Sequence, residues 1–171
     1  MRRTRTSAIA GGLAALIALG AVPAALASRH ATPRVAPNCV RSQLGVRSNG
    51  TNGAAGTIYG AWVFTNLSAT ACTLNGYPDL QLFGRTGRPI RTIVRRNLPP
   101  GPSSVRLAPG GSATFRTSYS DVAPGPTPCA MSAVAQITAP NVTASLYIPA
   151  ALAPCRGVVN VSAVRPGVHH A

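Results

Sequence analysis

The chain has 171 residues, with 16 basic side chains against 2 acidic ones and a formal net charge of +14. Every basic residue is arginine, and the only acids are Asp79 and Asp121, which excludes any chemistry that needs a cluster of carboxylates. A field of this sign attracts anionic polymers and surfaces without choosing among them.

Residues 1–27 predict a secretory signal peptide. Arginines within the first five residues form a positive n-region, residues 8–22 are an apolar run, and residues 25–27 ("ALA") fit the small-x-small cleavage rule. An uncleaved membrane anchor is the alternative, but it needs about 20 apolar residues and no cleavage site. Residues 28–38 are polar and hold two prolines, which predicts a flexible leader. We therefore expect a secreted protein, either extracellular or associated with the cell wall.

The cysteines predict two disulfides. All four cysteines follow the predicted signal peptide, and an even number of cysteines in an oxidising compartment indicates disulfide pairs. Three pairings are possible, and we favour Cys39–Cys72 with Cys129–Cys155 because each joins segments that are near in sequence. A zinc site or a redox-active pair would need Cys-x-x-Cys spacing, or nearby histidines in the case of zinc, and the sequence has neither.

From Cys39 onward the chain is expected to be strands separated by turns. Residues 113–119 ("ATFRTSY") alternate with a period of two, which is the mark of a half-buried strand, and helical periodicity is absent. Short strands that are separated by regular turn signals favour a two-sheet sandwich over residues 39–166, followed by a disordered tail at 167–171. The strands are expected near 40–47, 57–65, 79–83, 88–94, 103–107, 112–119, 131–138, 143–148 and 158–164.

Several segments together resemble a known family. They are "GAAGTIYGAWVFTNLSATACTLNGYPDLQLFGRTG" (53–87), "LAPGGSATF" (107–115) and "SLYIP" (145–149), which stands among the late cysteines. This chain resembles the family of domain of unknown function 4232, whose members are exported or lipid-anchored proteins of actinobacteria. The most specific part of the resemblance is "N-x-S…C-x-L-x-G-Y-P", from Asn66 to Pro78. The resemblance implies an immunoglobulin-like sandwich outside the membrane, and it implies no activity.

Catalytic, metal and cofactor sites are not expected. A glycosidase needs two carboxylates at a set separation, and Asp121 lies in a turn-forming segment far along the chain from Asp79. The histidines stand at position 30 and at positions 169 and 170, where a frayed terminus rarely holds a general base in place. No Gly-x-Ser-x-Gly motif is present. We therefore expect a protein that is not an enzyme and that has no cofactor.

The best candidate surface is the segment 84–104, "GRTGRPIRTIVRRNLPPGPSS". A cluster of guanidinium groups can clamp phosphates or carboxylates, although a solvated hairpin is the plainer interpretation. The segment has no aromatic residue for base stacking, so no specific nucleic acid is expected. A rigid Arg/Pro loop at 95–102 could instead inhibit a serine protease. The predicted anion-binding patch comprises Arg85, Arg88, Arg91, Arg95 and Arg96.

The function we predict is a secreted, non-catalytic binding domain of the cell envelope or the extracellular space. Its partner would be an anionic cell-wall polymer or another extracellular protein, and we expect a monomer with no transmembrane segment in the mature chain. The protease inhibitor is the alternative.

Overall fold

The computed structural model describes residues 35–99 and 101–171, so the predicted signal peptide and most of the predicted leader lie outside the described residues. Within the described part, all regular structure is strand apart from two short 3-10 turns, which confirms the all-β prediction. No helix there is long and apolar enough to cross a membrane. The elements are η1 (Arg41–Gln43), β1 (Leu44–Ala54), β2 (Thr57–Asn66), β3 (Cys72–Asn75), β4 (Asp79–Phe83), β5 (Pro89–Ile90), β6 (Ile93–Leu98), β7 (Ser104–Leu107), β8 (Ser112–Ser120), β9 (Val134–Thr138), β10 (Leu146–Pro149), η2 (Cys155–Gly157), β11 (Val158–Ser162) and β12 (Arg165–Pro166).

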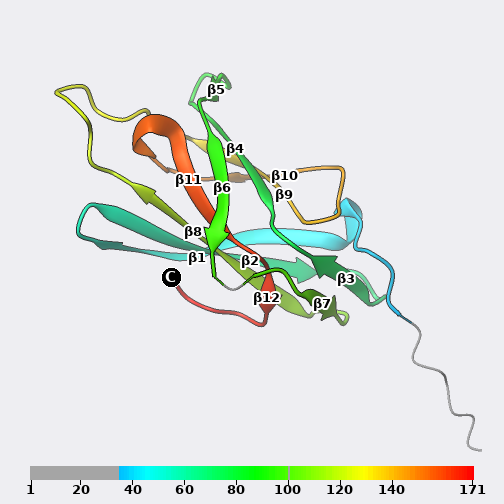
Figure 1. Ribbon diagram of the computed structural model, residues 1–171. Coiled ribbons are helices and arrows are strands. Elements are labelled where there is room, and N and C mark those ends of the chain that lie inside the picture. The colour runs from blue at the N-terminus through cyan, green and yellow to red at the C-terminus, as the bar shows by residue number, and fades with distance from the viewer. Residues whose placement is uncertain (1–34, 100) are drawn as a thin grey trace, which may run out of the picture. The chain divides into compact units, whose positions relative to one another are not determined.

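The largest sheet has six strands, in the order β1-β2-β8-β11-β6, with β12 also paired to β8. Its centre is the antiparallel pair β2–β8, in which Trp62 lies opposite Phe115 and Phe64 lies opposite Ala113. The alternation that predicts a strand at 112–119 therefore places these apolar side chains on one face. At one edge β6 runs parallel to β11, and the two strands lie side by side in Figure 1.

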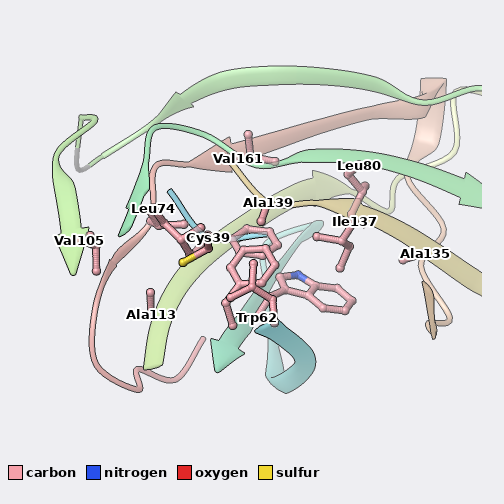
Figure 2. Packing of buried hydrophobic residues seen from close by; sticks show 14 of the residues in the cluster. Cys39, Trp62, Leu74, Leu80, Val105, Ala113, Ala135, Ile137, Ala139 and Val161 are labelled. Carbon is pink, nitrogen blue, oxygen red and sulfur yellow. The ribbon is translucent and has the colours of Figure 1, made fainter. Parts of the chain in front are cut away.

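Two smaller sheets complete the described fold. One has four strands in the order β10-β9-β4-β5, and the other is the two-stranded pair β3–β7. The sequence predicted two sheets, and the third was missed because β3 is only four residues long and its last residue, Asn75, belongs to an Asn-Gly turn signal. Buried side chains from all three sheets, such as Phe115, Ile137 and Leu74, form a single core, part of which is shown in Figure 2.

Aromatic stacking and one disulfide lie inside this core. The ring centroid of Phe115 is 6.3 Å from that of Trp62 and 5.3 Å from that of Phe64. Cys39 and Cys72 belong to the same buried cluster, and their disulfide ties the start of the domain to β3. The second disulfide links Cys129 to Cys155, so both predicted pairings are confirmed.

The first strand differs from its prediction. Residues 41–43 form a 3-10 turn, and β1 continues through residues 48–53, beyond the end of the strand predicted at 40–47. The pairing of β1 with β2 shifts register between Ser48 and Thr51, and Gly50 there has a φ of +98°. The glycine-rich stretch thus forms a bulge within the strand, and the chain reverses after it, at residues 55–56.

Hydrogen bonds to the sheets reach both ends of the described domain. The end of the predicted leader pairs with β3, because the Thr73 N–H donates to the Pro37 carbonyl and the Cys39 N–H donates to the Thr73 carbonyl. The predicted disordered tail, 167–171, is held against β8, where the His169 N–H donates to the hydroxyl of Thr114 at 3.0 Å. The partners, which are main-chain groups of Thr73 at one end and the buried hydroxyl of Thr114 at the other, are far along the chain, so a sequence pattern does not reveal them.

Candidate anion-binding surface

The β4–β5 hairpin presents Arg85 and Arg88. Its loop is closed by main-chain hydrogen bonds, from the Gly84 N–H to the Arg88 carbonyl at 2.9 Å and from the Gly87 N–H to the Gly84 carbonyl at 3.0 Å. Gly87 has a φ of +73°, which costs glycine little. Both arginines are exposed. The tight turn therefore holds two guanidinium groups at the end of the hairpin, at the top of Figure 1.

After β5 the chain passes from the four-stranded sheet to the six-stranded sheet at Arg91 and Thr92. The Thr92 hydroxyl donates to the Ile90 carbonyl at 2.8 Å and accepts from the Leu82 N–H at 3.1 Å. These bonds fix a bend, which is why the single strand predicted over 88–94 is two strands in two sheets. Arg91 is exposed at this crossing.

Arg95 and Arg96 lie farther on, in β6. Both are exposed, and Arg95 lies opposite Asn160 of β11 in the parallel pair. Consecutive residues of a strand point to opposite faces, so these two guanidinium groups do not share one face. The structure therefore divides the predicted patch. Arg85 and Arg88 form a hairpin group, Arg95 and Arg96 form a strand pair within β6, and Arg91 lies at the crossing between the sheets. It also does not favour the protease inhibitor, because both arginines belong to a paired strand rather than to a protruding loop.

A hollow of about 410 Å³ lies beside the hairpin group. Arg91 lines it from the crossing between sheets, and Arg156 lines it from the η2 turn. Cys129 also lines it, and the disulfide from Cys129 to Cys155 joins two of its walls. The sequence prediction missed Arg156 because a lone arginine far along the chain carries no local signal.

Little negative charge is available to neutralise these arginines. Asp79 and Asp121 are both exposed, and neither lines the hollow. Asp79 stands at the start of β4 and accepts a hydrogen bond from the Leu80 N–H at 3.0 Å. Asp121 follows β8, and its N–H donates to the Gly56 carbonyl at 3.2 Å. With 2 acids in the whole sequence, nearly all the guanidinium groups lack a carboxylate partner in the chain itself.

The comparisons with known proteins give one match. The model of the family described as "Domain of unknown function (DUF4232)" matches residues 39–165, which is more than half of the chain. The chain belongs to the DUF4232 family. No curated protein and no solved structure matches it.

The segment that carries the DUF4232 resemblance has a structural role in this chain. Asn66 is fully buried, and its amide donates to the carbonyls of Thr70 at 2.8 Å, Leu107 at 3.2 Å and Ala108 at 3.2 Å. Its Oδ1 accepts from the N–H and the hydroxyl of Ser68 at 3.0 and 2.7 Å. One side chain thus joins the end of β2, the loop after it and the end of β7. Figure 2 shows Cys39, the disulfide partner of Cys72 in the same motif, within the core.

The histidines in the described part of the chain hydrogen-bond to groups other than carboxylates. His169 contacts Arg165 and the Pro166 carbonyl, and His170 lies near Asn49; none of these contacts joins a histidine to an aspartate. No group of three or more His, Cys, Asp or Glu side chains in the described part could hold a metal ion. What the geometry does provide is exposed arginines in separate groups on hydrogen-bonded backbone, and a hollow that Arg91 and Arg156 line.

Proposed function

We propose that this chain is a secreted, non-catalytic binding domain with an immunoglobulin-like sandwich fold, which works as a monomer. Its ligand is an anionic polymer of the cell envelope, and its binding surface is the arginine surface. We define the arginine surface as the predicted patch with one residue added from the structure: Arg85, Arg88, Arg91, Arg95, Arg96 and Arg156.

The observation that carries this proposal is a set of exposed guanidinium groups on hydrogen-bonded backbone, none of which hydrogen-bonds to an acid within the described residues. Arg85 and Arg88 lie in the hydrogen-bonded turn between β4 and β5, Arg91 directly follows β5, and Arg95 and Arg96 belong to β6. Guanidinium groups bind phosphates and carboxylates through paired hydrogen bonds, and a surface of one sign concentrates polyanions. A polymer with repeating charges suits this surface because it can contact the hairpin group and one arginine of the strand pair at once.

The disulfides and the predicted signal peptide support a location outside the cytoplasm. Disulfides persist in oxidising compartments. If the signal peptide is removed as predicted, sequencing the N-terminus of protein recovered from the culture medium will begin at Ser28. A mature protein that still begins at Met1 and stays with the membrane would contradict secretion.

Retention on an immobilised polyanion tests the binding function. The protein is loaded on a column of poly(glycerol phosphate) and eluted with a salt gradient. Binding to such a polymer releases its counterions, so the affinity falls as the salt concentration rises. In the test variant, five arginines of the arginine surface are replaced by glutamine: Arg85, Arg88, Arg91, Arg95 and Arg96. In the matched control, five other arginines are replaced by glutamine: Arg41, Arg47, Arg106, Arg116 and Arg165.

Both variants lose the same charge, so net charge alone predicts equal elution. We expect the test variant to elute at clearly lower salt than the control variant. Circular dichroism of both variants checks that the strands are kept. Equal elution of the two variants would show that the chain binds by overall charge and that the arginine surface is not a site.

A further inference from the structure

The hollow beside the hairpin has the features of a specific subsite, and this inference rests on the proposed function. We propose that it binds one phosphorylated polyol unit of the polymer. The phosphate would lie between Arg91 and Arg156, and the carbon chain would lie against the apolar walls. The hollow's volume of about 410 Å³ is within the usual range of small-molecule sites.

The lining combines the two kinds of contact that such a unit needs. Pro89, Ala130 and Pro154 give apolar walls, and Arg91 and Arg156 give guanidinium groups. Guanidinium forks bind phosphate with two parallel hydrogen bonds, which are shorter and stronger than neutral ones. The apolar walls favour a ligand that carries carbon as well as charge, so inorganic phosphate should bind more weakly.

Within the described residues, neither guanidinium donates a hydrogen bond to a partner. The arginine side-chain hydrogen bonds within residues 35–99 and 101–171 come from Arg41, Arg47, Arg116 and Arg165. Arg91 and Arg156 are both exposed, and no acid lines the hollow. Their donors are therefore available to an incoming anion without the loss of an existing bond.

The walls are fixed before any ligand arrives. Gly157 has a φ of +73° and packs so closely on the crossing that a Cβ there would collide with the Arg91 carbonyl oxygen. The Gly157 N–H donates to the Pro154 carbonyl at 2.9 Å, and the disulfide ties Cys129 to Cys155. Fixing the walls in advance lowers the entropy that binding would otherwise cost.

The backbone of Arg156 gives an independent reason to look for function here. Its φ is +63°, in the left-handed region that costs a side chain with a Cβ about 1–2 kcal/mol relative to the ordinary conformation. Glycine or asparagine would adopt this conformation more easily. Strained residues of this kind gather at binding sites, so the strained position supports a role for the guanidinium itself.

The test is isothermal titration calorimetry with glycerol 1-phosphate, in comparison with inorganic phosphate. Arg156→Asn removes the guanidinium and suits the left-handed backbone. Ala130→Phe fills the hollow and leaves every arginine in place. Arg106→Gln is the control, because it removes one charge from β7, which lies at the opposite end of Figure 1 from the hairpin. Thermal unfolding of each variant confirms that it folds.

We expect one glycerol 1-phosphate per chain. The Arg156→Asn and Ala130→Phe variants should each bind it about tenfold more weakly or worse, since a charge-assisted bond or the cavity itself is lost. Arg106→Gln should change the affinity less than twofold. Equal affinity for inorganic phosphate, unchanged binding by either hollow variant, or an equal loss in Arg106→Gln would each overturn the subsite.

The polyanion column distinguishes failure of the subsite from failure of the proposed function. Ala130→Phe keeps all the arginines, so it should remain on the column even though it loses glycerol 1-phosphate. If the native protein is retained through the arginine surface but does not bind glycerol 1-phosphate, the subsite is wrong and the proposed function stands. If the native protein is not retained at all, the proposed function is wrong.

Discussion

Asn66 should be among the residues on which the stability of this domain depends most. Its side chain makes hydrogen bonds to three carbonyls and accepts two more from Ser68, all from a fully buried position. Truncation to alanine removes the two N–H donors of the amide and the two lone pairs of its oxygen, each worth about 1 kcal/mol net. In the variant the Ser68 hydroxyl is released from Oδ1 and can donate its one proton to the Thr70 carbonyl, 3.0 Å away, which reduces the loss. We therefore expect Asn66→Ala to lower the free energy of unfolding by about 3 kcal/mol.

The assay is unfolding in guanidinium chloride, followed by fluorescence. Trp62 is the single tryptophan and is buried, so it reports directly on the core. A loss of about 3 kcal/mol corresponds to a fall of roughly 10 °C in the melting temperature for a domain of this size. Asn52→Ala, at an exposed position in β1, is the control and should change stability by less than about 0.5 kcal/mol.

Asn66→Asp separates hydrogen bonding from size. Aspartate has the same shape, and its carboxylate can still accept both hydrogen bonds from Ser68. At neutral pH, however, it places a charged oxygen against the carbonyl oxygens of Thr70, Leu107 and Ala108. We expect it to destabilise the domain at least as much as alanine does, because the donors are lost and a buried charge is left unpaired. If Asn66→Asp is as stable as the native protein, the amide donors do not hold these three segments together.

Three further predictions concern the backbone at Gly157, the titration of Tyr119 and the hydrogen bond of Trp62 in the core. Gly157→Ala should destabilise by about 2–4 kcal/mol in chemical unfolding, through the left-handed backbone and the collision with Arg91; an unchanged midpoint would refute the close approach. Burial raises the pKa of Tyr119 above its ordinary 10.0, and Asp121 raises it further, although a backbone hydrogen bond lowers it. Because the folded state then holds this proton more tightly than the unfolded state, its contribution is present below pH 10 and is lost as the pH rises through the folded pKa. Melting temperatures measured across alkaline pH should therefore fall less steeply in Tyr119→Phe, and parallel curves would contradict this. Trp62→Phe loses the bond from its indole N–H to the Thr117 hydroxyl at 3.0 Å and should cost about 2–3 kcal/mol, read from melting curves because the fluorophore is gone; a loss below about 0.5 kcal/mol would mean that this bond contributes little.

The features that are local in sequence were the predictable ones. Alternation along 112–119 identifies β8, and the even number of cysteines with short separations favours, among three possible pairings, the two disulfides that form. A strand with one buried face must repeat every two residues, so its signal survives in a single sequence. The exposed arginines of the hairpin were also predictable, because "GRTG" is a turn and a turn lies at the surface.

The features that depend on distant partners were not predictable. β3 is a strand because it pairs with β7, in a register that sets Cys72 opposite Leu107. The break between β5 and β6 depends on the hydroxyl of Thr92, which satisfies main-chain groups of two strands. Arg156 and Arg91 line the same hollow because Gly157 packs against the Arg91 backbone and a disulfide holds η2. Periodicity within a window carries no information about such pairings.

Chemical-shift mapping of the native protein with poly(glycerol phosphate) tests the central claim most directly. The backbone amide signals of isotope-labelled protein are followed as the polymer is added. The account predicts that the largest shifts fall on residues 84–96 and 155–157, which carry the arginine surface and one wall of the hollow. Shifts spread evenly over all the arginine-bearing strands, or centred on β7 and the C-terminal segment, would contradict it.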